Sequence, residues 1–210
     1  MPQFDDRFRQ TLSDLFAWRR DVRRFRDDPV CETALRDCLA LASLSPSVGN
    51  SQPWRFVRVS DSERRRAVTE SFERCNAAAA LGYDASRRDL YLGLKLAGLR
   101  EAPVHLAVFC DEATEAGLGL GRATMPEMLR YSVVGAIQTF WLATRARGIG
   151  VGWVSILEPA RVRAALDVPE SWHLVAYLCV GHPREEHLDP ELVRHGWQDR
   201  DADAAKLFER

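Results

Sequence analysis

The stretch Arg19-Arg20-Asp21-Val22-Arg23-Arg24-Phe25 decides how the rest of this sequence is interpreted. It places four arginines within six residues, with one carboxylate between them. Clustered guanidinium groups repel one another unless water or an anion faces them, and arginine is well suited to bidentate phosphate contacts. The cluster therefore indicates either a solvated basic surface or a phosphate site. Asp21 is either a salt-bridge partner of these arginines or a group that moves a proton beside a ligand.

The composition is that of an ordinary globular protein. The 210 residues, 46% of them hydrophobic and 28% charged, fit one large domain over residues 1–210. The net charge of −1 gives no long-range attraction to nucleic acid or to acidic membranes. No apolar run is long enough to span a bilayer, and the charged N-terminus does not resemble a signal peptide. The cysteines, five in number and without a C-x-x-C pair, predict reduced core thiols in the cytoplasm.

A second informative stretch is Ser45-Pro46-Ser47-Val48-Gly49-Asn50-Ser51-Gln52-Pro53, which is dense in turn-forming residues. Its hydroxyls, amide and backbone N–H groups are hydrogen-bonding edges of the kind that a flat heteroaromatic ligand needs. An ordinary connection between a helix and a strand is the alternative. No Rossmann, P-loop or G-x-S-x-G motif is present, and no zinc-ligand spacing, so we expect no metal.

The periodicity of the apolar residues predicts six helices and four strands. The helices are expected over 4–18, 30–43, 62–80, 84–100, 126–147 and 159–166, and the strands over 54–60, 104–110, 151–157 and 173–181. This order has no regular βαβα alternation and indicates an α+β plan. Helix 126–147 is apolar on most of its surface, which predicts burial centrally or at a subunit interface.

Two connecting segments and one hydroxyl complete the pattern. The segment 111–124 contains three glycines and is expected to be a mobile loop, and the polar arm 183–210 either wanders or wraps another surface. Ser155 is expected on a strand among bulky apolar residues. A buried hydroxyl there needs a partner, which is either backbone or a polar ligand edge.

Three segments together resemble the FMN-dependent nitroreductase superfamily. They are the arginine stretch 19–25, the serine-rich stretch followed by Trp54, and Gly148-Ile149-Gly150-Val151-Gly152-Trp153. The resemblance covers nearly the whole chain. It implies a nitroreductase-like α+β fold with a mixed, largely antiparallel sheet flanked by helices, a long central or interface helix and an extended C-terminal arm. It also implies a homodimer with FMN at the interface.

Carried over residue by residue, the resemblance assigns the FMN contacts. They are Arg19, Arg20, Arg23, Arg24, Ser45, Pro46, Ser47, Asn50, Gln52, Leu94, Trp153 and Val154. The segment of about 82–100, together with the Met125 region, is expected to form a lid that excludes water. Core packing is the alternative for these apolar residues.

Within the superfamily the sequence is most similar to the 5,6-dimethylbenzimidazole synthase family. The similarity lies in the aspartate inside RRDVRRF and in the stretches LKLAGLREAPVHLAVFCDEAT, GLGLGRATMPEMLRYSVVGAIQ and GWVSILEP. It implies an enzyme that uses O₂ to fragment reduced FMN into 5,6-dimethylbenzimidazole, the lower ligand of cobalamin, and erythrose 4-phosphate. FMN is then consumed as substrate, and the resemblance ties Asp21 and Ser155 to the reaction.

Other activities compatible with the same fold define the alternatives. One is an NAD(P)H-dependent nitroreductase or flavin reductase that retains its FMN, and another is a non-catalytic flavin carrier. No nicotinamide site is recognisable, so a separate NAD(P)H-dependent flavin reductase is expected to supply the reduced FMN.

Overall fold

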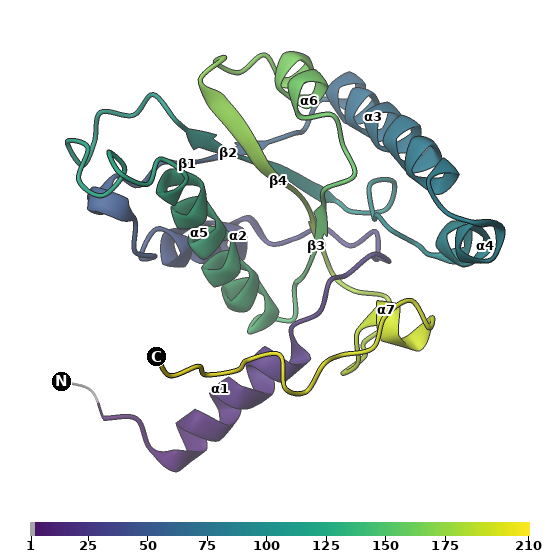
Figure 1. Cartoon of the computed structure of the whole chain (residues 1–210), viewed down its shortest axis with the longest axis horizontal. Helices are drawn as coiled ribbons and strands as arrows, with labels where there is room; N and C mark the ends of the chain where they lie inside the picture. Colours follow the sequence, from purple (N-terminus) through teal and green to yellow (C-terminus); the bar gives the residue numbers. More distant parts are fainter. Residues whose placement is uncertain (1–2) are drawn as a thin grey trace.

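A four-stranded sheet lies between two layers of helices in the computed structural model, which describes residues 3–210 (Figure 1). The strands, in their spatial order, are β1 (Trp54–Arg58), β2 (Val104–Asp111), β4 (Trp172–Gly181) and β3 (Gly150–Val154). Every neighbouring strand pair in the described part of the chain is antiparallel. The predicted α+β plan is confirmed. Its mixed character is limited to a single parallel bridge between Asp21 and Val151.

The helices form one layer on each face of the sheet. Their bounds are α1 (Asp6–Trp18), α2 (Glu32–Ala42), α3 (Ser62–Leu81), α4 (Ala85–Gly93), α5 (Met128–Arg145), α6 (Pro159–Leu166) and α7 (Glu191–Arg194). The long helix α5 packs with α2 on one face, and α3 and α6 pack together on the other (Figure 1). Among the described helices and strands, α1 packs against α5 alone, so much of its surface is uncovered.

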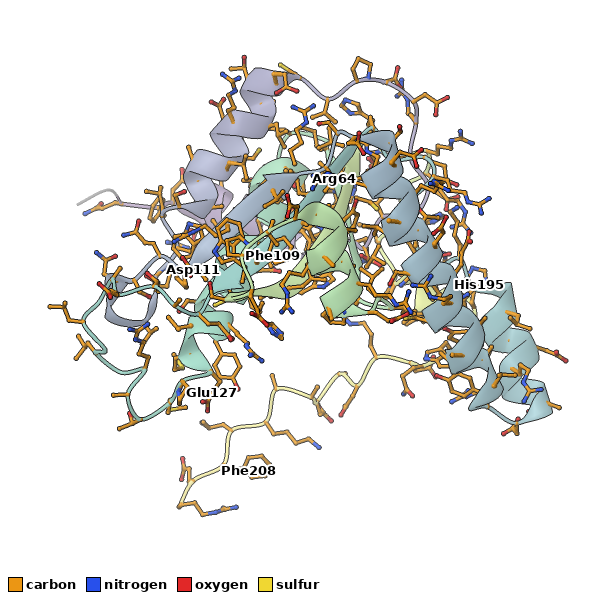
Figure 2. All side chains as sticks on the ribbon, turned by 90° about the horizontal axis from the view of Figure 1, so that it is seen from above. Arg64, Phe109, Asp111, Glu127, His195 and Phe208 are labelled. Carbon is orange, nitrogen blue, oxygen red and sulfur yellow. The ribbon has the colours of Figure 1, made fainter. Side chains whose placement is uncertain are left out.

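Strand β2 shows why both faces are covered. All but the last of its residues are buried, as the nearly continuous apolar run predicts for a sheet covered on both sides. Leu106 and Val108 belong to the core beneath α2 and α5, whereas Ala107 and Phe109 belong to the core beneath α3 and α6. Figure 2 shows Phe109 in the interior of the molecule.

The expected helix 84–100 is shorter in the structure, where α4 ends at Gly93. Leu94 has an extended backbone, and the chain then passes beneath the side chain of Phe25. A Cβ at Gly98 would lie 2.4 Å from the Phe25 ring, so this passage leaves no room for a side chain. The reason is tertiary packing, which overrides the helical periodicity of the sequence.

The prediction that Ser155 is a buried strand residue is wrong. β3 ends at Val154, and Ser155 is exposed just beyond it. β3 is an edge strand with one neighbour, and the chain leaves the sheet to enter α6, which begins with Pro159. The expected helix 126–147 also begins later, at Met128.

The C-terminal arm has two parts. Residues 183–200 lie against the body and contain α7, whereas Phe208 lies on a tail that runs apart from the body in Figure 2. The cysteines Cys38, Cys110 and Cys179 are buried and unpaired, as expected of core thiols, but Cys31 is exposed. No helix in residues 3–210 combines the length and apolar character needed to cross a membrane.

Candidate active site

The segment 19–25, which we call the arginine turn, is fixed along the edge strand β3. The Val22 N–H donates to Val151 O at 3.0 Å. A Cβ at Gly152 would lie 2.1 Å from Val22 O, so only glycine permits this approach. At the other end of the turn, Phe25 is completely buried and forms a bridge with Pro183. The turn is therefore held at both ends, and its polar side chains have defined positions.

Asp21 is oriented by both of its carboxylate oxygens. Oδ1 accepts the Trp153 N–H at 2.8 Å, and Oδ2 accepts Arg23 Nε at 2.9 Å. Arg23 also donates to Lys95 O at 2.9 Å, which ties the turn to the segment after α4. Burial raises the pKa of Asp21, while Arg23 and the Trp153 N–H oppose that shift. The salt-bridge interpretation of Asp21 is confirmed, yet its side chain remains 29% exposed.

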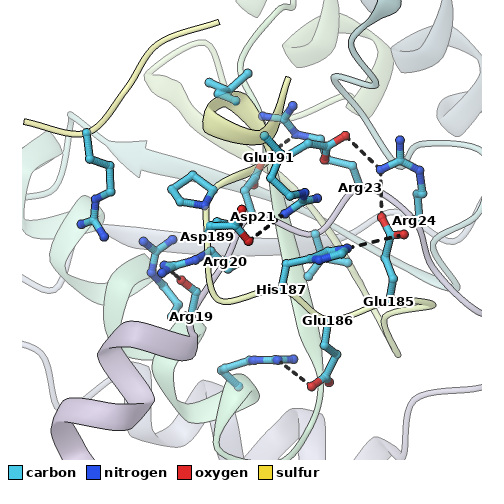
Figure 3. A pocket seen from close by; sticks show the side chains of 16 residues that line it. Arg19, Arg20, Asp21, Arg23, Arg24, Glu185, Glu186, His187, Asp189 and Glu191 are labelled. Atoms are coloured by element: carbon cyan, nitrogen blue, oxygen red, sulfur yellow. Dashed lines mark hydrogen bonds and ion pairs between the residues drawn. The ribbon is translucent and has the colours of Figure 1, made fainter. Parts of the chain in front are cut away.

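A cavity of about 300 Å³ opens beside the arginine turn, and Figure 3 shows the side chains around it. It is lined by the turn, by the end of α5 and by the C-terminal segment 185–200. Most of its charges are paired. The ion pairs are Arg23–Asp21, Arg24–Glu185, Arg24–Glu191, Arg145–Glu186 and Arg194–Asp189. Arg24 is thus held by two carboxylates, which both contact its Nη1, at 3.1 and 2.9 Å.

Three arginines of this cavity have no carboxylate within 4.0 Å among residues 3–210: Arg19, Arg20 and Arg200. The Arg19 guanidinium carbon lies 4.8 Å from the centre of the Trp141 ring, and Arg20 Nε donates to Leu188 O at 2.6 Å. Burial lowers the pKa of Arg19 and of Arg20, and the charge of Arg200 lowers both further. Mutual repulsion of this kind is relieved when an anion binds between the cations.

The serine-rich loop lies elsewhere on the protomer. Ser45 Oγ donates to Thr139 Oγ1 at 2.7 Å, and Ser132 Oγ accepts the Val48 N–H at 3.0 Å. Thr139 and Ser132 belong to α5, whereas Trp18 contacts Arg145 at the last residue of that helix. At a rise of 1.5 Å per residue, Thr139 and Ser132 are roughly 9 and 20 Å from Arg145 along α5. The structure therefore does not bring the predicted loop contacts Ser45, Pro46, Ser47, Asn50 and Gln52 into the cavity.

Two residues of the loop have an uncommon backbone conformation. Asn50 and Gln52 adopt positive φ values of 53° and 45°, and both are exposed. Non-glycine residues in the left-handed region concentrate at ligand-binding sites, because the surrounding structure must hold them there. Ser47 Oγ accepts the Gln52 N–H at 3.0 Å and contributes to this hold.

The remaining predicted residues are grouped around Asp21. Trp153 is half-buried and bonds to the Asp21 carboxylate, and Val154 is buried behind it. Leu94 is buried next to Lys95, whose carbonyl accepts Arg23. Ser155 is two residues beyond Trp153. The arginine turn, β3 and the segment after α4 therefore meet, as the resemblance implies.

Helix α4, in the segment expected to form a lid, is attached to the C-terminal arm. The Trp197 ring lies 5.4 Å from Tyr83 and 6.0 Å from Tyr91, measured between ring centres. The Arg87 guanidinium carbon lies 4.8 Å from the centre of the same indole. The arm therefore contacts both the cavity and α4.

Sequence reasoning missed the contribution of the arm and of the end of α5 to the cavity. Arg145, Arg194 and Arg200 line it, together with Glu185 and Glu191. The only signal in the sequence is the density of charges after Pro183, which by itself is equally typical of a solvated tail. Among the described residues, no three His, Cys, Asp or Glu side chains gather as metal ligands.

Comparison with known proteins gives a consistent result. The sequence profile described as the nitroreductase family matches residues 16–182. The chain is 64% identical over 199 residues to the 5,6-dimethylbenzimidazole synthase of Rhodospirillum rubrum, covering 95% of this chain and 94% of that protein. It is 43% identical over 196 residues to the enzyme of the same name from Rhodobacter capsulatus, covering 93% and 95%.

A solved structure shares this fold and also part of the sequence. It is iodotyrosine deiodinase bound to FMN and 3-iodo-L-tyrosine, with a TM-score of 0.71 and 26% sequence identity. The match covers 84% of this chain and 91% of the deiodinase chain.

Proposed function

The chain belongs to the nitroreductase family, and we propose that it fragments reduced FMN with O₂ into 5,6-dimethylbenzimidazole and erythrose 4-phosphate. The first product supplies the lower ligand of cobalamin. One observation carries this proposal: the 64% identity to a 5,6-dimethylbenzimidazole synthase extends over 95% of the chain. The flavin is accordingly a substrate that is consumed, and the protein is an oxidoreductase.

The cavity beside the arginine turn suits the phosphate end of this substrate. Arg19, Arg20 and Arg200 are cations without carboxylate partners among the described residues, and they repel one another. A phosphate dianion satisfies such a cluster with charge-assisted hydrogen bonds. Arg19 is preorganised for this role, because the Trp141 ring supports its guanidinium group.

We assign to Asp21 the transfer of a proton on the ribityl chain, next to the phosphate. The reduced flavin supplies the electrons that O₂ takes up. In this proposal, Asp21 accepts the proton when the C–H bond at the ribityl carbon C1′ breaks. That carbon becomes C2 of dimethylbenzimidazole, the other four sugar carbons leave as erythrose 4-phosphate, and the pyrimidine ring of the flavin leaves as a third fragment. Two fixed hydrogen bonds orient the carboxylate, and burial raises its pKa toward the range useful in acid–base catalysis.

Ser155 has a different task in this proposal. Its side chain is exposed beyond the end of β3, next to the Asp21–Trp153 contact. We assign its hydroxyl to the edge of the isoalloxazine ring. An exposed hydroxyl is available for such a bond without the loss of an internal one.

We propose that the serine-rich loop contacts FMN across the interface of a homodimer. Because no residue of this loop lines the cavity, and its contacts on α5 lie roughly 9 to 20 Å before Arg145, we assign the loop to the FMN bound mainly by a second copy. The exposed apolar side chains of α1 and α5 provide a surface for that copy. They are Phe8, Leu12, Phe16, Tyr131 and Val134. The cytoplasm is the expected location, and a separate NAD(P)H-dependent flavin reductase is the expected source of reduced FMN.

The test supplies chemically reduced FMN and air, without nicotinamide, and measures flavin loss and dimethylbenzimidazole. We expect the wild type to convert FMN and Asp21→Asn to bind FMN but form little product. Ser155→Ala should also form less product, without loss of stability. Asp37→Asn, on the exposed side of α2, is the matched control and should behave as wild type.

Other results of this test would contradict the proposed reaction or the proposed role of Asp21. Quantitative recovery of FMN by the wild type would overturn the proposal. Reduction of a nitroaromatic substrate by NAD(P)H with retained FMN would then identify a nitroreductase, and binding without turnover would identify a flavin carrier. Failure of Asp21→Asn to bind FMN would make Asp21 structural.

A further inference from the structure

Arg145, the last residue of α5, is a buried cation with too few partners. Its side chain is only 4% exposed, and it lines the cavity beside the arginine turn. Its guanidinium carbon lies 3.6 Å from the centre of the Trp18 ring, and Nη2 lies 3.3 Å from Glu186 Oε2. Nε and Nη1 are buried without a hydrogen-bond partner among the described residues. Buried polar nitrogens are normally satisfied, so this group calls for an explanation.

Glu186 does not supply that explanation. Its side chain is 45% exposed, and the same oxygen accepts the Trp18 indole N–H at 3.1 Å. Water therefore weakens its attraction to Arg145. Arg23 of the same cavity offers a comparison, since it is similarly buried but bonds to both Asp21 and Lys95 O. Burial lowers the pKa of Arg145, and Glu186 alone opposes the shift.

Arg145 lies close to Arg19, one of the arginines of the turn that have no carboxylate partner among the described residues. Arg19 stacks on Trp141, which lies one helical turn before Arg145 on α5, and Arg145 stacks on Trp18, the residue before Arg19. The two guanidinium groups and the two indoles thus interleave where α1 meets α5. In Figure 3, Glu186 lies beside the cavity, and the dashed line at its carboxylate marks the ion pair with Arg145.

We propose that Arg145 is an additional oxyanion-binding residue of this cavity, which contacts the phosphate monoester of the flavin. This inference rests on the proposed function. On binding, the phosphate takes the place of Glu186, and the half-exposed Glu186 carboxylate turns to water. The dianion offers several oxygens to a guanidinium group, whereas Glu186 now offers one that is shared with Trp18.

The test compares binding of oxidised FMN and of riboflavin, which lacks the phosphate, to the full-length protein. Arg145→Met keeps the packing on Trp18 and removes the charge. We expect FMN to bind about tenfold or more weakly and riboflavin to change by less than about twofold. Inorganic phosphate should compete with FMN on the wild type more strongly than on Arg145→Met. Without ligand, this variant should melt close to the wild type, because Arg145 Nε and Nη1 make no hydrogen bond in the described structure.

Arg147→Met is the matched control. Arg147 lies just beyond the end of the same helix, pairs with Asp37 at 3.7 Å and does not line the cavity. Its removal should leave both flavins bound as in the wild type. Arg145→Lys retains the charge and guards against a folding defect. It should fold and bind FMN more weakly than the wild type, because lysine lacks the planar fork.

Three outcomes would overturn the inference. Equal weakening of FMN and riboflavin would make Arg145 a purely structural residue. Dissociation of the dimer by Arg145→Met, seen in sedimentation, would place the missing acceptor in the second copy. An unchanged preference of Arg145→Met for FMN over riboflavin would show no phosphate contact. If the wild type itself does not prefer FMN, the proposed function fails as well, which separates the two failures.

Discussion

Gly152→Ala tests whether the arginine turn depends on its close approach to β3. The added Cβ would lie 2.1 Å from Val22 O, whereas ordinary contact begins at 3.4 Å. The turn must therefore retreat by about 1.3 Å. That movement breaks the 3.0 Å bond from Val22 N to Val151 O and the 2.8 Å bond from Trp153 N to Asp21 Oδ1.

The expected cost follows from these losses. Overpacking costs about 1–3 kcal/mol, and each lost hydrogen bond costs about 1 kcal/mol. The sum, roughly 3–5 kcal/mol, is a large part of the free energy of unfolding of a whole domain, which is typically about 5–15 kcal/mol. FMN affinity should fall in parallel, because Asp21 and its neighbouring arginines move with the turn.

The assay is urea unfolding followed by tryptophan fluorescence, combined with FMN titration. A loss of this size lowers the urea midpoint by at least about 1 M. Gly93→Ala is the matched control, because a Cβ there meets nothing within 4 Å, and its midpoint should stay near that of the wild type. A Gly152→Ala protein with an unchanged midpoint and normal FMN binding would refute the close approach as the device that fixes the turn.

Two further predictions concern a buried histidine and the anchor of α4. Burial lowers the pKa of His105 from 6.5 to about 4, so the unfolded chain takes up this proton first and stability is lost as pH falls from 6.5 to 4. The loss is about 3 kcal/mol, and His105→Gln should show a flatter decline in urea midpoints over that range. Trp197→Ala removes the contacts of the indole with Tyr91 and Arg87 of α4 and with Tyr83 just before it, so the α4 amides should exchange hydrogen about tenfold faster or more. Unchanged exchange would mean that α4 does not depend on the arm.

The elements with strong local signals could be predicted from the sequence. α6 matches its expected range at both ends, because Pro159 marks its first residue. The continuous apolar run of β2 predicts a sheet covered on both faces, and both cores are present. His105 is a core residue bonded to Tyr177 at 2.9 Å, as its apolar surroundings predict.

Features that depend on distant contacts could not be predicted. α4 stops where the chain must pass Phe25, and nothing within residues 84–100 signals that ring. Ser155 is exposed because the chain leaves β4 after Val154 to enter α6, although its flanking residues are apolar. The family motif identified the arginine turn, but the pairing of Arg24 with Glu185 and Glu191 comes from residues more than 160 positions away.

This distance along the chain sets the order in which the site can form during synthesis. Arg20 leaves the ribosome well before its acceptor Leu188, which follows 168 positions later. The last wall of the cavity is therefore translated when nearly all of the sheet is complete. A nascent or prematurely terminated chain contains the arginines but lacks the segment 185–200 that lines the cavity. We therefore expect only chains that include this segment to bind the flavin tightly.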